Sequence, residues 1–305
     1  MSRKLRIYRP LRTDPDALEA VTVGRESILD DILRTLGRWE PGASRQHHLI
    51  IGPRGIGKTH LLQLIRHRIG QSASLKSKWW PVSFGEEEYG ITKTADLLLS
   101  ALGILARETD DPSLKTAHDQ LRYDDDDQKV IDRALDALRR FHAARGCGLL
   151  LMTENMDQLL ERQIKSPRDL RGLRKILIEE DWIALIWTSP TYLSAVTNPE
   201  HPFFEFFRTI NLSELTVSEQ EEMLGKMASL EGNPSFEEER PRWRSRLEAL
   251  HHFTGGNPRL TVMLYNLVVN QRITEVREEL DHLLDELTPY YQDRMKTLPA
   301  HEAKL

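Results

Sequence analysis

Apolar residues in the first two thirds of the chain form two kinds of pattern, short continuous runs and repeats at helical spacing. The continuous runs predict five strands, at His48–Ile51, Trp79–Phe84, Gly148–Met152, Trp182–Trp187 and Thr209–Leu212. Repeats at about 3.6-residue spacing predict helices between them, at 28–36, 59–69, 91–106, 128–144 and 169–180. This alternation of strands and helices is typical of a parallel sheet with helices on both faces.

Beyond Leu215 the pattern is helical only. It predicts helices at 218–230, 242–253, 258–269 and 274–287. Thr216 and Glu219 have the spacing of a capping box before the first of these helices. The expected fold is therefore α/β, a doubly wound parallel sheet followed by an all-helical lid.

Two stretches show neither pattern. The first twenty residues are basic and contain prolines, which favours an arm over a regular element. Glu108–Gln128 is polar and includes four consecutive carboxylates, Asp124–Asp127. Such a run could hold a metal ion, but it is more typical of a solvated surface whose charges repel one another.

Composition narrows the class of protein. The 305 residues are 39% hydrophobic and 29% charged, which suits one large globular domain or two linked ones. The mean hydropathy is −0.49 and no apolar run reaches the ~18 residues of a membrane span, so we expect no membrane partner. A single cysteine, Cys147, allows no intrachain disulfide and fits a cytoplasmic location. The net charge of −5 is not that of an obligate nucleic-acid binder, although it leaves room for a local basic patch.

The strongest motif follows the first predicted strand and opens a helix. Gly52-Pro-Arg-Gly-Ile-Gly-Lys-Thr59 matches G-x-x-x-x-G-K-S/T in full. Its glycines let backbone N–H groups surround phosphate oxygens, Lys58 can reach the β- and γ-phosphates, and the Thr59 hydroxyl can bind Mg²⁺. The pattern predicts a nucleoside triphosphate site formed by Gly52, Pro53, Arg54, Gly55, Ile56, Gly57, Lys58, Thr59 and His60.

A magnesium-dependent phosphate site also needs acidic residues at the end of another strand. The apolar run that begins at Gly148 leads into Glu154-Asn-Met-Asp157, and no other strand end offers a comparable pattern. This segment is therefore the predicted acidic part of a magnesium site that also includes Thr59.

Three further short motifs lie in order around these two. They are Val23-Gly-Arg-Glu26, Trp187-Thr-Ser-Pro190 and Gly255-Gly-Asn-Pro-Arg259. Taken together, residues 21–287 resemble AAA+ ATPases, in particular the branch of archaeal and eukaryotic origin-recognition initiators and STAND-like bacterial regulators. The resemblance implies ATP and Mg²⁺ as cofactors.

The resemblance also implies roles for individual residues. Val23, Gly24 and Arg25 would lie on the adenine side of the nucleotide, and Glu154–Leu159 would be the DExDxL motif. Thr188 or Ser189 would be sensor 1, and Arg259 would be sensor 2, contacting the γ-phosphate from the lid. Arg208 stands where the family places an arginine finger that acts across a subunit boundary; an ordinary surface arginine is the alternative.

The acidic motif departs from the family pattern. In one register Glu154 replaces the magnesium-associated aspartate and Asn155 replaces the glutamate that activates water. Asparagine cannot accept a proton, so a general-base contribution of roughly 10²–10⁴ would be missing and hydrolysis would be slow. In the other register Thr153 and Glu154 occupy these two places. We favour the first register because it also aligns Asp157 and Leu159.

The resemblance divides the chain into an arm (1–20), a nucleotide-binding domain (21–215), a lid (216–288) and a tail (289–305). A winged-helix DNA-binding domain commonly follows the lid in this branch, and the eighteen residues after Leu287 cannot form one. Either the chain lacks that domain or the sequence is truncated.

The predicted function is a nucleotide-dependent switch that forms a homo-oligomer. Its output would be assembly on DNA or recruitment of a DNA-associated protein. The alternative is a STAND-like signalling or defence ATPase that a protein ligand activates. A metabolic NTPase or kinase is disfavoured because no motif for an acceptor substrate is present.

Overall fold

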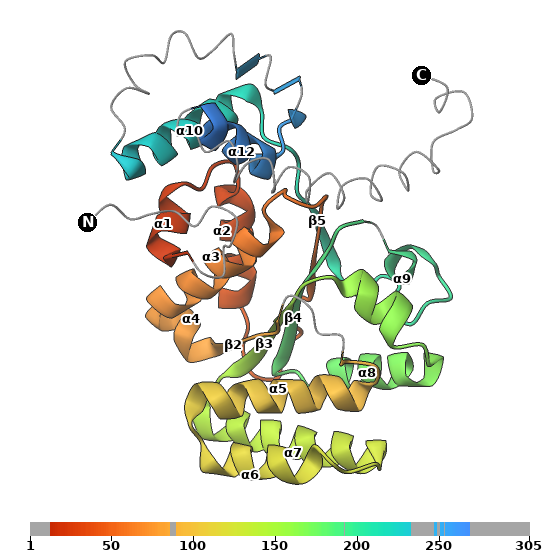
Figure 1. Cartoon of the computed structure of the whole chain (residues 1–305). Helices are drawn as coiled ribbons and strands as arrows, with labels where there is room; N and C mark the ends of the chain where they lie inside the picture. The colour runs from red at the N-terminus through yellow and green to blue at the C-terminus, as the bar shows by residue number, and fades with distance from the viewer. Residues whose placement is uncertain are drawn as a thin grey trace. The chain divides into compact units, whose positions relative to one another are not determined.

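A computed structural model describes residues 13–85, 90–191, 193–232, 247–248, 251–252 and 254–268. Its centre is a five-stranded sheet with the strand order β2-β3-β4-β1-β5 (Figure 1). The strands are β1 His48–Ile51, β2 Trp79–Ser83, β3 Gly148–Thr153, β4 Ile183–Ser189 and β5 Arg208–Asn211. The pairs β1/β4, β2/β3 and β3/β4 are parallel, and β1, β3 and β4 are buried along their whole lengths. The doubly wound parallel sheet predicted from the apolar runs is confirmed.

The chain forms two compact units. The sheet unit comprises residues 31–51 and 65–210, and the loop–lid unit comprises residues 1–30, 52–64 and 211–305. Helices α2 (Glu26–Gly37) and α3 (Lys58–Gln71) contribute to both. The predicted domain boundaries stay a prediction.

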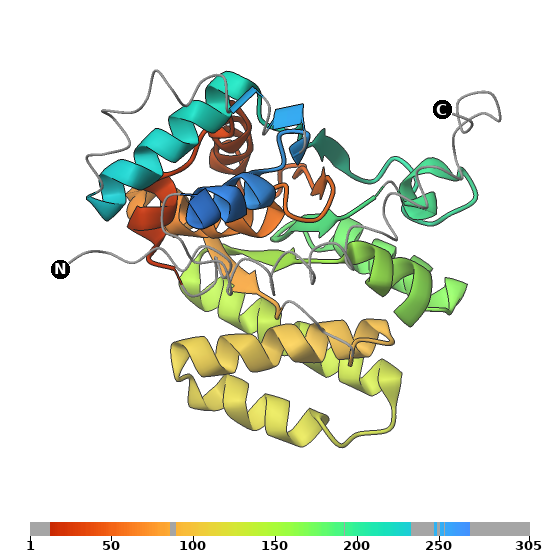
Figure 2. The same ribbon diagram turned by 45° about the horizontal axis from the view of Figure 1, so that its top comes forward.

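The sheet unit carries a layer of three helices. In both views α5 (Thr94–Thr109) lies beside α6 (Pro112–Leu121) and α7 (Asp127–Arg145), and the three contact one another (Figures 1 and 2). Gly103 of α5 lets α6 approach, since a Cβ there would stand 2.8 Å from Nε2 of His118. The unit's other helices are α4 (Ala73–Lys78), π-helix η2 (Gln158–Gln163), α8 (Pro167–Glu179) and α9 (Ser194–Thr197).

The sequence pattern of Glu108–Gln128 predicted neither a strand nor a helix, and this was wrong, because the stretch contains α6. Asp111 caps the helix by accepting from the backbone N–H of Ser113, Pro112 occupies its first turn, and Leu114 and Leu121 are buried. Proline and the aspartates therefore mark a helix boundary here.

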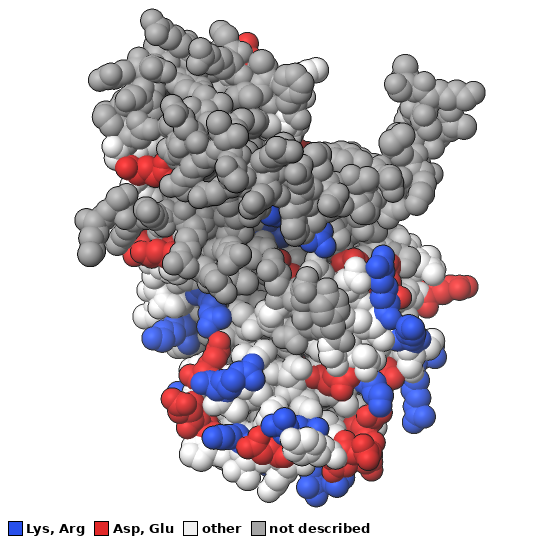
Figure 3. Space-filling model, viewed as in Figure 1, with Lys and Arg blue, Asp and Glu red and all other residues white. Residues whose placement is uncertain are grey.

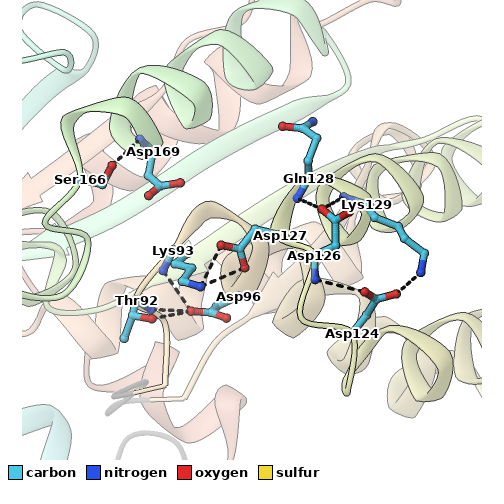
Figure 4. A network of polar contacts seen from close by, with 10 residues as sticks. All are labelled: Thr92, Lys93, Asp96, Asp124, Asp126, Asp127, Gln128, Lys129, Ser166 and Asp169. Atoms are coloured by element: carbon cyan, nitrogen blue, oxygen red, sulfur yellow. Dashed lines mark hydrogen bonds and ion pairs between the residues drawn. The ribbon is translucent and has the colours of Figure 1, made fainter.

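Three of the four carboxylates in the run 124–127 are engaged within the sheet unit (Figure 4). Asp126 caps α7 by accepting from the N–H groups of Gln128 and Lys129. Asp124 pairs with Lys129 at 2.5 Å, and Asp127 pairs with Lys93 at 2.8 Å. Among the described residues no group of three or more His, Cys, Asp or Glu side chains could hold a metal ion.

The loop–lid unit contains α1 (Pro15–Ala20), α10 (Val217–Glu231) and α12 (Pro258–Val268). Helix α10 contacts both α1 and α12. Their shared core includes Ala17, Val23, Met223, Met227 and Tyr265. The predicted capping box is confirmed, since Thr216 Oγ1 accepts from the N–H of Glu219 at 3.2 Å and the Glu219 carboxylate accepts from the N–H of Thr216 at 2.7 Å.

The predicted arm requires a correction. Residues 15–20 form α1, which Asp14 caps, with Pro15 in its first turn and Ala17 and Leu18 buried. The short polar segment forms a helix whose Ala17 packs into the lid core, and Leu18 is buried as well.

Several sequence predictions lie wholly or mostly outside the described residues. These are the rest of the arm, the lid helices Arg242–Phe253 and Thr274–Leu287, and the tail 289–305. The predicted helix Pro258–Val269 is confirmed as α12. In the described part of the chain, no helix has the length and apolar character that crossing a membrane requires.

Candidate nucleotide-binding site

The phosphate loop connects β1 to α3. Gly55 and Gly57 have φ angles of +80° and +101°, a region that favours glycine. A Cβ on Gly52 would lie 2.9 Å from Cγ2 of Ile56, and one on Gly55 would lie 2.8 Å from Oδ1 of Asn257. A Cβ on Gly57 would meet nothing within 4 Å. Space therefore requires glycine at positions 52 and 55, and backbone conformation favours glycine at positions 55 and 57.

Lys58 is held at the inside of this loop. Its Nζ donates to the carbonyl oxygens of Gly52 at 2.7 Å and Pro53 at 3.1 Å, and the residue is only 8% exposed. Because α3 begins at Lys58, the N–H groups of its first turn lie beside this cation. A buried cation, a helix N-terminus and glycines with positive φ fit the phosphate groups of a nucleotide. Thr59 follows at once with a hydroxyl that fits Mg²⁺.

Arg25 ties three segments of the loop–lid unit together. Its guanidinium donates to the carbonyl oxygens of Ser213 at 2.7 Å, Gly24 at 3.2 Å and Ile56 at 3.4 Å. Burial lowers the pKa of Arg25, against the opposing effect of the nearby Glu219 carboxylate. Arg25 therefore holds the tip of the phosphate loop through its backbone.

The other residues predicted around the loop lie in the same unit. Val23 belongs to the lid core, and Gly24, at φ +66°, is packed so closely by Glu219 that a Cβ would collide with its carboxylate. His60 Nε2 lies 2.8 Å from Thr22 Oγ1. Because that hydroxyl donates to the carbonyl of Leu18, the imidazole is the donor. Burial, together with the charge of Arg25, lowers the pKa of His60 to about 4, so the ring is neutral near pH 7.

The turn that contains Arg259 docks on the phosphate loop. Nδ2 of Asn257 donates to the carbonyl of Arg54 at 3.0 Å, and the N–H of Arg259 donates to the carbonyl of Gly55 at 3.2 Å. Oδ1 of Asn257 accepts from the N–H groups of Arg259 and Leu260, which caps α12. The sequence motif drew attention to Arg259, but the side-chain contact with the loop belongs to Asn257. An asparagine before a proline at a helix start was the available signal.

A buried polar network connects this turn to α10. Gln220 is 1% exposed, and its Nε2 donates to the hydroxyls of Thr254 at 3.2 Å and Thr261 at 2.5 Å. Nδ1 of His251 lies 2.6 Å from Oε1 of Gln220. The Thr261 hydroxyl donates to the carbonyl of Asn257 at 2.9 Å, so hydrogen bonds run without a break from α10 to the phosphate loop. Sequence reasoning missed Gln220, because its burial depends on residues more than thirty positions away.

We expect Asn257→Ala to lower the free energy of unfolding by about 1–2 kcal/mol, because it removes the cap of α12 and the bond to Arg54. Asn257→Asp keeps the cap and loses only the amide donor. Thermal denaturation of both variants, with ATP affinity measured by calorimetry, separates the two contributions. Wild-type stability and affinity in Asn257→Ala would show that the turn docks without this side chain.

Acidic and polar residues lie at the carboxyl ends of β3 and β4. In the register of the parallel sheet, Thr153 of β3 lies opposite Trp187 of β4. Ser189 of β4 lies opposite Ile51 of β1, the residue before the phosphate loop. The Ser189 hydroxyl donates to the carbonyl of Thr191 at 2.7 Å. The Thr188 hydroxyl is buried and has no hydrogen-bond partner among the described residues.

The segment after β3 has unusual backbone geometry. Asn155 has φ +54°, a left-handed conformation that asparagine tolerates better than most residues. Burial raises the pKa of Asp157, whose Oδ2 accepts from Nε2 of Gln158 at 3.1 Å. The π-helix η2 follows directly, and π-helical turns are frequent at functional sites. Neither the left-handed residue nor the π-helix was predicted from sequence.

Arg208 lies at the amino end of β5, where its N–H donates to the carbonyl of His47 at 2.8 Å. Its guanidinium pairs with Asp31 at 2.7 Å and the side chain is 47% exposed. The phosphate loop follows the opposite end of β1, about 13 Å along a strand of four residues. The role of Arg208 as an arginine finger stays a prediction.

Comparison with known proteins gives one family and a set of related folds. The model of the AAA ATPase domain family matches residues 21–173. No curated protein matches the chain in sequence.

Solved structures are similar in fold at low identity. The ORC1 protein of Aeropyrum pernix, solved in complex with DNA, is 17% identical with a TM-score of 0.59, over 97% of this chain and 73% of that one. The Walker-type ATPase PABY2304 of Pyrococcus abyssi is 13% identical with a TM-score of 0.57, over 90% and 76%. The ORC2 protein of A. pernix is 19% identical with a TM-score of 0.51, over 68% and 52%, so this chain spans about half of its length.

Proposed function

The chain belongs to the AAA ATPase domain family, and on this premise we propose that it is an ATP- and Mg²⁺-dependent switch. The observation that carries the proposal is the docking of the 255–259 turn on the phosphate loop, through Asn257 to Arg54 and through the N–H of Arg259 to Gly55. A loop built for phosphates is thereby in direct contact with a lid element. Nucleotide binding at the loop would act on the lid through these bonds.

Each residue of the proposed site has its own role in binding the nucleotide or Mg²⁺. Lys58 and the N–H groups of the loop hold the phosphates, and Arg259 adds a cation from the lid. Thr59 and Glu154 bind Mg²⁺, while Thr188 or Ser189 supplies a hydroxyl at the end of β4. When bound, Mg²⁺-ATP supplies the phosphoanhydride and concentrates negative charge at the loop.

The same network gives the switch a route into the lid. A change at Arg54 or Gly55 alters the bonds of Asn257, and Thr261 and Gln220 pass the change to α10. Because Gln220 is buried, breaking a hydrogen bond in this network costs about 1–3 kcal/mol. A free energy of that size is enough to shift an equilibrium between two conformations of the 255–259 turn.

We expect slow hydrolysis in the wild type, with Glu154 near Mg²⁺ and Asn155 in place of the base. Asn155→Glu, and Asn155→Asp with less backbone strain at φ +54°, should raise single-turnover hydrolysis because each restores a proton acceptor. Quenched-flow measurements with ATP affinity determined in parallel give the result.

Glu154→Gln distinguishes the two registers. If Glu154 is the base, this variant still binds ATP but does not hydrolyse it, and a carboxylate at position 155 brings no gain. A fast wild-type rate that Asn155→Ala leaves unchanged would contradict the slow switch.

We infer that ATP promotes a homo-oligomer that assembles on DNA or recruits a DNA-associated protein. The fold similarity to ORC1, a protein solved in complex with DNA, supports this choice. Light scattering after size exclusion, with ADP, with ATP, and with ATP plus duplex DNA, tests it. Assembly that appears only with an added protein ligand would favour the STAND-like alternative.

A further inference from the structure

A strongly basic stretch follows the acidic motif in a chain whose net charge is −5. Residues 162–175 include one acidic side chain, Asp169. They include six basic ones, Arg162, Lys165, Arg168, Arg171, Arg174 and Lys175. In Figure 3 basic side chains gather over the region that η2 and α8 occupy in Figure 1, whereas both signs mix over α5–α7. No role in nucleotide binding accounts for this concentration of charge.

Helix α8 sorts these residues onto one face. Leu170, Leu173 and Leu177 are buried. Arg168, Arg171 and Lys175 are exposed and occur at spacings of three and four residues, on the opposite side of the helix. We call these three residues the α8 basic face.

The cations of this face are less fully paired than some others of the sheet unit. Lys93 pairs with Asp127 at 2.8 Å, and Arg139 pairs with Glu180 at 2.6 Å. Within the described residues no ion pair involves Arg168 or Arg171. Lys175 has a single partner, Glu179 at 3.7 Å, on an exposed surface.

An open groove of 630 Å³ lies beside the face. Arg171, Lys175 and Glu179 of α8 line it, together with Pro199, Pro202, Phe204 and Glu205 from the segment before β5. Arg174 fastens the two sides by donating to the carbonyl oxygens of Pro202 and Phe204, with its guanidinium 5.3 Å from the ring centroid of Phe206. The groove is therefore a built feature of the sheet unit.

Gly172 is a glycine within α8, beside the basic residues of the face. It lies inside α8, where glycine is less favourable than alanine, yet a Cβ there would meet nothing within 4 Å. Its spacing of four residues from Arg168 and three from Lys175 puts it on the basic face. Nothing in the described part of the chain requires glycine at position 172. A bound molecule that closely approaches the helix backbone would require it.

We propose that the α8 basic face binds the phosphate backbone of duplex DNA, with Arg168, Arg171 and Lys175 on phosphates and Gly172 permitting close approach. The three cations span about 10 Å of helix, and a DNA strand presents a phosphate every ~3.4 Å of its axis, so three contacts fit. These are contacts to phosphates, so binding here is independent of base sequence. The inference rests on the DNA arm of the proposed function and names the surface that serves it.

The test is the salt dependence of binding to a fluorescently labelled duplex, measured by anisotropy without nucleotide. The variant Arg168→Ala/Arg171→Ala/Lys175→Ala should reduce the slope of log K against log salt by about 2.7 and weaken binding roughly 100-fold at 0.1 M salt. The matched control is Arg122→Ala/Arg133→Ala/Arg140→Ala, which removes three exposed charges from the α6–α7 region. The control should bind within about threefold of the wild type.

Gly172→Ala keeps the test valid if the triple variant folds poorly. It should raise the melting temperature, since alanine favours the helix, and still weaken DNA binding. Equal losses in the triple variant and its control, an unchanged salt slope, or a wild type that does not bind duplex DNA at low salt would each overturn the proposal. ATP affinity is measured on the same proteins. A loss of DNA binding with unchanged ATP affinity concerns the α8 basic face alone and leaves the proposed nucleotide switch intact.

Discussion

Replacement of Lys58 by alanine is expected to weaken ATP binding at least 100-fold. Lys58 is 8% exposed, and its ammonium is held at the inside of the phosphate loop by the carbonyl oxygens of Gly52 and Pro53. A charge-assisted bond to phosphate at such a buried position contributes about 3 kcal/mol, which corresponds to this factor. Isothermal titration of Mg²⁺-ATP into the folded variant measures the effect.

Two further variants control this experiment. Lys58→Arg keeps the charge but changes the shape of the donor group, so affinity should remain low. Lys76→Ala removes an exposed lysine of α4 and should bind ATP as the wild type does. Unchanged ATP affinity in a folded Lys58→Ala protein would remove the assignment of residues 52–59 as the phosphate loop.

Replacement of Arg208 by alanine is also expected to have a large effect, on hydrolysis and not on ATP binding. If Arg208 completes the site of a neighbouring subunit, its loss should lower oligomer-dependent ATP hydrolysis by about 10³-fold, because the guanidinium stabilises charge in the transition state. ATP binding by the monomer should change little, since Arg208 lies at the amino end of β5. Turnover measured as a function of protein concentration gives the comparison.

Asp31 supplies the control for Arg208. It is the ion-pair partner at 2.7 Å, so Asp31→Ala removes the surface pair and keeps the arginine. If Arg208 is an arginine finger, only Arg208→Ala should lose ATP turnover, and Asp31→Ala should keep it. A surface pair predicts that both variants lose at most about 1 kcal/mol of stability and that neither affects hydrolysis in an oligomer that still forms.

Sequence alone identified the features that depend on neighbouring residues. The strand runs, the helix periodicities, the Thr216–Glu219 capping box and the phosphate loop were all found, since each is fixed by residues a few positions apart. The family followed from the order of the short motifs along the chain. The register of Glu154 and Asn155 is still a prediction, because either alignment fits the same strand.

Local patterns were less informative where a short element depends on distant packing. Helices α1 and α6 were taken for an arm and a polar loop, because each has few apolar residues and a proline in its first turn. Their buried side chains, Ala17 and Leu18 in α1 and Leu114 and Leu121 in α6, form helical faces only against other elements. Periodicity over six or ten residues is too short to reveal such a face.

Only the tertiary structure shows which lid residues contact the phosphate loop. Asn257 bonds to a carbonyl 203 residues earlier in the chain, and Gln220 joins Thr254 and Thr261 from another helix. Backbone carbonyls carry no sequence signal, because every residue has one, so no motif could point to Arg54 or Gly55 as partners. The sequence determined that a phosphate loop and an arginine-bearing turn exist; only the fold determined that Asn257 joins them.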